Sequence, residues 1–186
     1  MRKLGFVSMI AALFIMVSAQ VKSVSNFEFL QNELPEDWVK LDKTDFSIQY
    51  PDSLTVDTSG QMGMSFMLFT NQVSGTDLFM ENMNLVIEDL QGYEITLDDY
   101  VEVSKTQLKQ YITALKPVSS KRITVDGREY HKLIFTGKQG QFNLKWQQRY
   151  YIENGKAFVL TTTSEKDQYD TYSSVLGKLM STFKIK

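Results

Sequence analysis

The chain has 186 residues, of which 20 are Lys or Arg, 22 are Asp or Glu, one is His and none is Cys. This near-neutral balance argues against nucleic-acid binding, which favours a clustered basic excess. The absence of cysteine excludes disulfides and a lipidated cysteine anchor, so the fold must be held by packing alone.

Residues 1–19 are typical of a cleavable signal peptide. Arg2 and Lys3 precede the almost entirely apolar stretch Leu4–Val17, and the small residues Ser18 and Ala19 follow at the expected cut. The alternative is an uncleaved membrane anchor, but the stretch is shorter than the roughly 20 apolar residues that span a bilayer. We therefore expect an exported protein, periplasmic or extracellular and bacterial, with no stable membrane anchor after cleavage.

The mature part of the chain is interpreted as residues 20–34, a short lead-in segment, followed by a single domain over residues 35–186. This length is ordinary for one domain with a sizeable core. Alternating apolar residues predict a strand over Asp45–Tyr50, which Pro51 ends because proline cannot donate to a strand ladder.

Two apolar runs, Met64–Thr70 and Met83–Glu88, predict further strands, and the composition of Asn71–Asp77 predicts a loop between them. A helix follows, with Thr96 as N-cap and acidic residues in its first turn. The predicted helix ends at Lys116-Pro117. Its apolar face is expected to consist of Leu97, Val101, Ser104, Leu108, Ile112 and Leu115.

The second half of the chain is predicted to be a meander of antiparallel strands. The expected order is a strand over Lys121–Val125, an Asp126-Gly127 turn, a strand over Arg128–Thr136, a loop over Gly137–Gly140, a strand over Phe142–Ile152, an Asn154-Gly155 turn and a strand over Ala157–Thr163. A closing helix presents Tyr172, Leu176, Leu179 and Phe183 on one face. Apolar residues on both faces of Tyr130–Phe135 predict a central strand covered on both sides. The fold class is therefore α+β, with an antiparallel sheet packed against helices.

The order of short motifs along this chain resembles the PsbP-like family. These motifs are Trp38, Tyr50-Pro51, Asn84-Leu85-Val86-Ile87, Leu97-Asp98-Asp99-Tyr100, Val125-Asp126-Gly127-Arg128 and Ser181-Thr182-Phe183. The resemblance implies an αβα sandwich with a central antiparallel sheet flanked by helices. Members include the PsbP subunit of photosystem II, a Ran-binding nuclear import factor and the DcrB-like envelope proteins, which imply an accessory domain that docks on a larger assembly. The family's metal sites have no matching motif here, so none is transferred.

Three groups of residues are candidates for chemistry, and each has a structural explanation that we favour. His131 is the only histidine, with Leu133 and Phe135 on its side of the strand, and is interpreted as a structural, partly buried residue. The acidic cluster Glu88, Asp89, Asp98, Asp99 and Glu102 is explained by the helix start and by solvation rather than by calcium. The methionines Met62, Met64, Met67, Met80 and Met83 are expected to fill the core or an adaptable docking surface rather than to bind Cu(I). Strand alternation predicts that Met64 and Met67 lie on opposite faces.

Two further segments bear on binding. In the strand Asn143–Tyr150, the polar side chains Lys145, Gln147 and Arg149 share one face, which is expected to be solvated or, alternatively, to form a docking surface. The apolar residues Leu78-Phe79-Met80, which follow the predicted loop, are expected to re-enter the core.

These observations predict an exported accessory or binding domain that docks on a partner protein or an envelope component. It is not expected to be an enzyme, to bind a cofactor or to bind nucleic acid, and no catalytic, cofactor-binding or metal-ligating residue is assigned. A carrier of a small apolar ligand or lipid, with a pocket between sheet and helix, is the alternative. A hydrolase would require a serine and a carboxylate within reach of His131.

Overall fold

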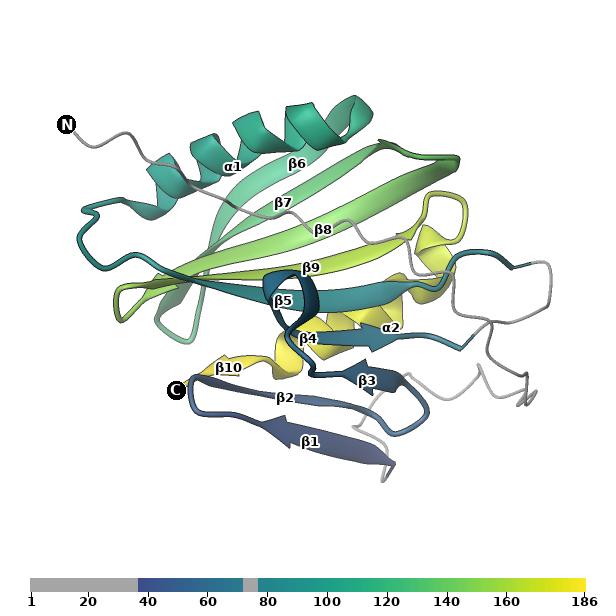
Figure 1. The fold of residues 1–186 in the computed structure, drawn as a ribbon, viewed down its shortest axis with the longest axis horizontal. Helices are drawn as coiled ribbons and strands as arrows, with labels where there is room; N and C mark the ends of the chain where they lie inside the picture. The colour runs from purple at the N-terminus through teal and green to yellow at the C-terminus, as the bar shows by residue number, and fades with distance from the viewer. Residues whose placement is uncertain (1–36, 72–76) are drawn as a thin grey trace.

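Strands dominate the computed structural model, which describes residues 37–71 and 77–186 (Figure 1). The predicted signal peptide over residues 1–19, the lead-in segment over residues 20–34 and residues 72–76 of the predicted loop lie outside the described residues. The strands are β1 (Trp38–Asp42), β2 (Phe46–Pro51), β3 (Thr55–Asp57), β4 (Met64–Phe69), β5 (Asn82–Asp89), β6 (Thr113–Val125), β7 (Arg128–Gln139), β8 (Phe142–Glu153), β9 (Lys156–Glu165) and β10 (Lys184–Ile185). The helices are α1 (Leu97–Tyr111), α2 (Tyr169–Thr182) and a short 3-10 turn over Gln61–Gly63.

The strands form two antiparallel sheets, so the predicted α+β class with antiparallel strands is confirmed. Seven strands lie in the order β3-β4-β5-β9-β8-β7-β6, and three lie in the order β1-β2-β10. The second sheet was not predicted, because β10 contains only Lys184 and Ile185 and pairs with Ser47 and Phe46 of β2. A strand this short has no sequence period, and it forms only where a distant strand is already in place.

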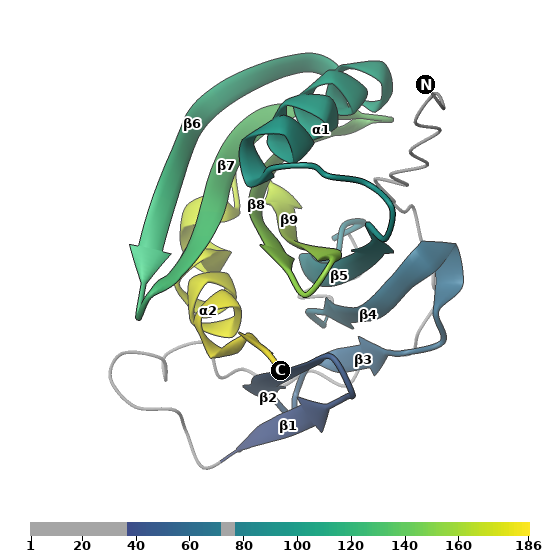
Figure 2. The same ribbon diagram turned by 90° about the vertical axis from the view of Figure 1, so that its left-hand side faces the viewer.

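Both faces of the inner strands of the seven-stranded sheet are buried, whereas its edge strands β3 and β6 are largely exposed. One apolar cluster combines α1 with inward side chains of β7, β8 and β9, including Phe135 and Trp146, whose rings stack 5.1 Å apart. The other cluster combines α2 and β2 with residues of β4, β5, β8 and β9, including Phe46 and Phe66. Figure 2 shows β8 and β9 between the two helices. Burial on both sides follows from apolar residues at odd and even positions of the same strands.

Helix α1 begins as predicted but ends earlier than the sequence pattern indicates. Thr96 is the N-cap, its hydroxyl accepts a hydrogen bond from the backbone N–H of Asp99, and Val101 and Leu108 are buried. Ile112 is already extended, and β6 starts at Thr113, so the predicted end at Lys116-Pro117 was wrong. The helix ends early because, from Thr113 onward, the backbone pairs with β7 along the whole of β6 instead of forming helical hydrogen bonds. Pro117 is tolerated because β6 is an edge strand.

Two further expectations about β7 are corrected. The loop predicted over Gly137–Gly140 is mostly strand, because β7 continues to Gln139. Gly137 is required inside that strand, since a Cβ atom there would overlap Cγ2 of Ile112. Strand β7 is covered on both faces, through Tyr130 on one side and Leu133 on the other, but it is next to the edge rather than central.

The two hairpin turns form where the sequence predicts them. Asp126 and Gly127 have φ angles of 51° and 77°, and Asn154 and Gly155 have 54° and 70°. Positive φ at both central residues is the geometry of tight two-residue hairpins. The first turn projects the tip of the β6–β7 hairpin toward the end of α2, which positions the cleft described below.

Substitution of Gly137 tests the close approach of β7 and the end of α1. Gly137→Ala forces its methyl group into Ile112, and we expect a loss of about 1–3 kcal/mol in the free energy of unfolding, measured by chemical denaturation. Gly177→Ala in α2 is the matched control, because a Cβ there meets no atom within 4 Å. The control should be neutral or more stable by up to about 1 kcal/mol. Equal stability of the two variants would contradict the packing described here.

Candidate functional site

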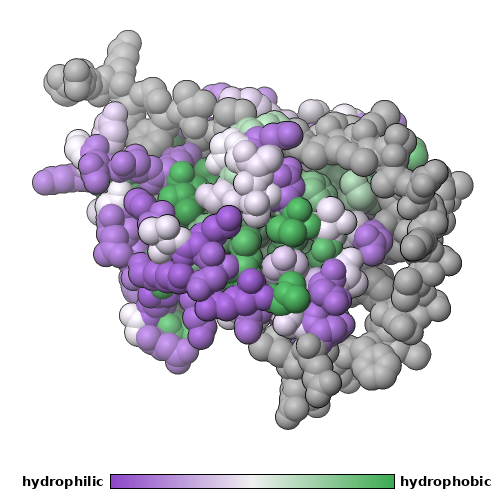
Figure 3. Space-filling view, turned by 60° about the horizontal axis from the view of Figure 1, so that its bottom comes forward, coloured by the Kyte–Doolittle hydropathy of each residue, from purple (hydrophilic) through white to green (hydrophobic). Residues whose placement is uncertain are grey.

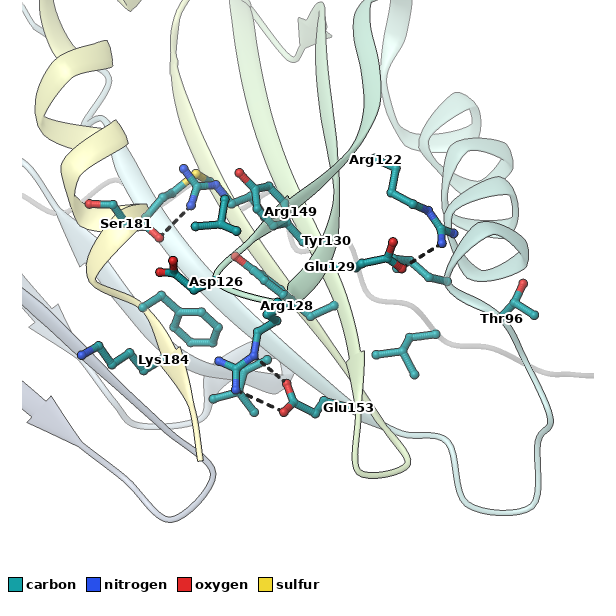
Figure 4. Close-up of a pocket in the computed structure, with 18 of the residues that line it drawn as sticks. Thr96, Arg122, Asp126, Arg128, Glu129, Tyr130, Arg149, Glu153, Ser181 and Lys184 are labelled. Carbon is teal, nitrogen blue, oxygen red and sulfur yellow. Dashed lines mark hydrogen bonds and ion pairs between the residues drawn. The ribbon is translucent and has the colours of Figure 1, made fainter.

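A cleft of about 1200 Å³ opens at the tip of the β6–β7 hairpin. Its walls are the hairpin itself, the ends of β8 and α2, and β10, and it continues around the hairpin to the residues that precede α1. Figure 4 shows Arg149 and Ser181 on one side of the hairpin and Arg122 with Glu129 on the other. Because segments far apart in the sequence meet here, the cleft is not readable from any one motif.

The floor of the cleft is aromatic. The rings of Tyr130 and Tyr151 lie 5.3 Å apart, and Phe183 lies 5.8 Å from Tyr151. The guanidinium of Arg149 lies 5.1 Å from the centroid of Tyr130, in cation–π geometry. Burial raises the pKa of Tyr151, and the positive charge of the neighbouring Arg149 offsets part of this rise. The floor therefore combines flat apolar surface with one permanent positive charge.

Ion pairs form the rim. Nε of Arg128 lies 3.1 Å from Glu153, whose two carboxylate oxygens both contact the guanidinium. Arg122 lies 2.6 Å from Asp98 and 3.1 Å from Glu129, and the hydrogen bond that Arg122 donates to Asp98 raises the pKa of Arg122. These pairs are exposed to solvent, where such interactions contribute little to stability. An incoming ligand can therefore replace the ion-pair contacts of these charges with little loss of folding stability.

Helix α2 covers part of the polar face of β8, where Gln147 is buried and Lys145 and Arg149 are half-buried, so the expectation of a fully solvated face is corrected. The ammonium of Lys145 lies 3.4 Å from the centroid of Tyr169, and the amide of Gln147, 8% exposed, lies 2.8 Å from Sδ of Met180. Arg149 donates to the carbonyl oxygen of Met180 at 3.0 Å. A cation at the carboxyl end of a helix compensates its unpaired carbonyl groups.

The acidic cluster is dispersed among separate structural contacts. Asp99 accepts a hydrogen bond from Thr96 at the start of α1, Glu102 pairs with Lys105, and Glu88 accepts from the hydroxyl of Tyr100 at 2.8 Å. Among residues 37–71 and 77–186, no three His, Asp or Glu side chains are arranged to hold a metal ion. The part of the chain that the structure describes therefore assigns this cluster no metal.

His131 lies half-buried between α1 and β6. Its Nε2 is 2.7 Å from Oγ of Ser120, so a serine is within reach of the histidine. Its Nδ1 is buried and has no hydrogen-bond partner within the described residues. Burial lowers the pKa of His131, and Lys105 lowers it further. A carboxylate that would orient the ring for hydrolysis thus does not contact Nδ1 in this part of the chain.

Met64, Met67 and Met83 are buried and Met62 and Met80 are half-buried, but one expectation about the methionines was wrong. Met64 pairs with Val86 and Met67 pairs with Asn84, which are two residues apart on one strand, so the two methionines share a face. A bulge between Met64 and Phe66 causes this, because one extra residue reverses the alternation. Both are buried, and Met83 lies in the cluster under α2.

The segment before β5 re-enters the molecule only in part. Phe79 packs against Phe142, with ring centroids 5.2 Å apart, whereas Leu78 is 68% exposed. Next to this segment lies Glu81, a buried carboxyl group that is 2% exposed. Its Oε1 accepts from the backbone N–H of Glu165 at 3.3 Å, and its carbonyl accepts from Thr70.

Burial, with smaller contributions from the charges of Asp77 and Glu165, raises the pKa of Glu81 to about 7. The pKa of Tyr172 rises to about 12, mainly because of burial. The negative charges of Glu81 and Asp77 contribute to this rise. No pattern in the sequence marks Glu81, because its burial arises from β9 and α2, which lie about 80 residues further along the chain.

Comparison with known proteins finds similarity only at the level of structure. No protein-family model matches the chain, and no curated protein matches it significantly. The solution structure of cyanobacterial PsbP (CyanoP) from Synechocystis sp. PCC 6803 is similar, with a TM-score of 0.63 and 16% identity. The match covers 84% of this chain and 97% of that one.

Two other solved structures are also similar. A protein of unknown function from Pseudomonas aeruginosa, PA94, described as a putative regulator, gives a TM-score of 0.56 at 11% identity, covering 78% of this chain and 94% of its own. LpqN, involved in cell envelope biogenesis of Mycobacterium tuberculosis, gives 0.54 at 10% identity, covering 76% and 83%. Identities this low establish a shared fold and leave the functions separate.

The pKa of Glu81 predicts a pH dependence of stability. The folded pKa, about 7, lies above the ordinary value of 4.5, so the folded state holds the proton more tightly than the unfolded state. The free energy of unfolding should therefore fall as pH rises from 4.5 to 7, by at most about 3 kcal/mol. Glu81→Gln should remove most of this fall and be more stable than the parent at pH 8, as measured by urea denaturation across pH.

Glu94→Gln serves as the control, because Glu94 is exposed. Its pH profile should coincide with that of the parent. A Glu81→Gln variant that retains the parent's slope between pH 4.5 and 7 would show that another group causes the dependence.

Proposed function

We propose that this chain, which has the PsbP-like fold, is an exported accessory domain that binds a protein partner or an envelope component and catalyses no reaction. The helices α1 and α2 on opposite faces of the sheet support assigning it the αβα sandwich of that fold. The observation that carries the proposal is the open, charged and aromatic cleft at the β6–β7 hairpin.

The chemistry of the cleft favours a protein surface over an apolar ligand. Its rim carries Arg128, Glu153 and Lys184 around the ring of Tyr130. Aromatic and arginine side chains are enriched in protein interfaces. An apolar ligand or lipid in the same place would remove water from the Arg128–Glu153 ion pair and from Lys184 without supplying polar contacts, which is unfavourable. The carrier function therefore stays the alternative.

On the face drawn in Figure 3, hydrophobic residues are interspersed among hydrophilic ones rather than gathered in one broad apolar patch.

Export is proposed from the sequence of residues 1–19. No described helix is both long and apolar enough to cross a bilayer. One of the similar structures, LpqN, is involved in cell envelope biogenesis, which is compatible with a role outside the cytoplasm. The absence of an enzymatic role is proposed because Nδ1 of His131, the only histidine, has no carboxylate partner within the described residues.

Capture of the partner tests the proposal. The full chain, tagged after Lys186 and produced in its own organism, would be purified from the envelope fraction, and its intact mass measured. We expect a mass that lacks residues 1–19 and one stoichiometric protein partner. Arg128→Glu with Lys184→Glu, on the rim of the cleft, should lose that partner.

The matched control is Lys43→Glu with Lys109→Glu, which makes the same charge change at exposed lysines outside the cleft lining. It should retain the partner, and thermal unfolding should confirm that both variants fold. Retention by the cleft variant would place binding elsewhere. A co-purifying lipid or metabolite without a protein would support the carrier, and a full-length mass would refute export.

A further inference from the structure

A row of three cations crosses the sheet on the side that α2 covers. Lys121 of β6 lies directly opposite Lys132 of β7, and Lys132 lies directly opposite Arg149 of β8. Directly opposite side chains point to the same face, and neighbouring strands lie about 4.8 Å apart. Burial lowers the pKa of Lys132, and the charges of Arg149 and Lys121 lower it further. Like charges directly opposite each other oppose folding. The carbonyl of Met180 and the ring of Tyr130 compensate Arg149, whereas no ion pair within the described residues involves Lys121 or Lys132, so an anion beside these two lysines would relieve the repulsion.

The charge of the surrounding surface has the same sign. The register places further lysines on this face of β6, β7 and β8, namely Lys116, Lys138 and Lys145. The acidic residue that the same three strands place there is Glu153, which Arg128 already pairs. Within the described residues, no ion pair involves Lys116, Lys121, Lys132 or Lys138. Five lysines and Arg149 thus share one side of one sheet in a chain whose net charge is −2.

This cationic face, defined by Lys116, Lys121, Lys132, Lys138 and Lys145, adjoins the cleft. Arg149 belongs to the row and also lines the cleft, beside Met180 and Ser181 of α2. The flank of α2 next to β8 carries Ser173 and Gly177, and a Cβ added to Gly177 would meet no atom within 4 Å. No side chain of the described chain therefore occupies the space beside Gly177.

We propose that the partner contributes an extended acidic polypeptide segment, which lies across the cationic face and enters the cleft. This inference rests on the proposed function and specifies the partner's chemistry. Charge complementarity requires an anion. Lys132 and Arg149 are half-buried beside α2, so carboxylates on a narrow extended chain fit them better than a flat bilayer surface does. Tyr130 and Tyr151 then provide an aromatic surface where the segment enters the cleft.

A defined peptide provides the test. Binding of a fluorescent ten-residue glutamate peptide to the purified full chain would be followed by anisotropy, with a ten-residue glutamine peptide for comparison. We expect binding of the glutamate peptide alone, weakening steeply as salt screens the charges. Lys121→Glu with Lys132→Glu should weaken it at least tenfold. Lys43→Glu with Lys109→Glu, which changes the net charge equally, should weaken it less than twofold.

Since Lys132 is half-buried, Lys121→Glu with Lys116→Glu provides a second variant at exposed positions, and it should also weaken binding at least tenfold. Equal weakening by these variants and by the control would overturn the inference. So would equal binding of both peptides, or tighter binding to vesicles containing phosphatidylglycerol than to the glutamate peptide.

The captured partner separates this inference from the proposed function. If a stoichiometric partner is captured equally by the parent and by the Lys121→Glu, Lys132→Glu variant, the accessory function holds and the cationic face is not its site. If only a lipid or metabolite is captured, the proposed function itself fails.

Discussion

Burial of both faces of the inner strands of the seven-stranded sheet is the constraint on which the rest of this structure depends. Strand alternation sends Trp146 and Tyr150 of β8 toward α1, and sends Tyr151 toward α2. Covering both faces uses both helices and the second sheet. The hairpin of β6 and β7 extends past the end of α2, and its tip forms the cleft with α2 and β10. The candidate site is thus a consequence of how the core is closed.

Arg149 connects the stability of the fold to the candidate site. Its guanidinium binds the last turn of α2 through Met180, lies near the ring of Tyr130 and forms one end of the cationic row. Contacts with Met180 and Tyr130 hold the half-buried guanidinium of Arg149 in one orientation, so a ligand meets a charge whose position is already fixed. Because the surrounding contacts already hold it in place, a partner that uses it loses little conformational entropy on binding.

The similar structures share this fold at 10–16% identity, which indicates how little of the sequence the fold prescribes. Alternation of apolar residues and a few turn residues are local features that different sequences can supply. The surface is free to vary, so a partner has to be inferred from the charges of this chain. Lys121 and Lys132 are informative for that reason, since they are like charges directly opposite each other and no ion pair within the described residues involves either.

The sequence by itself determined what depends on local pattern. The N-cap at Thr96, the Asp126-Gly127 and Asn154-Gly155 turns and the antiparallel α+β class follow from neighbours in the chain, because capping and turn geometry involve only a few residues. The tertiary structure alone decided where α1 ends, why Gly137 is a glycine and how Glu81 is buried. It also decided that α2 covers part of the polar face of β8, and that β6, α2 and β10 meet in one cleft. Each of these depends on contacts between segments far apart in sequence, whose pairing no local period encodes.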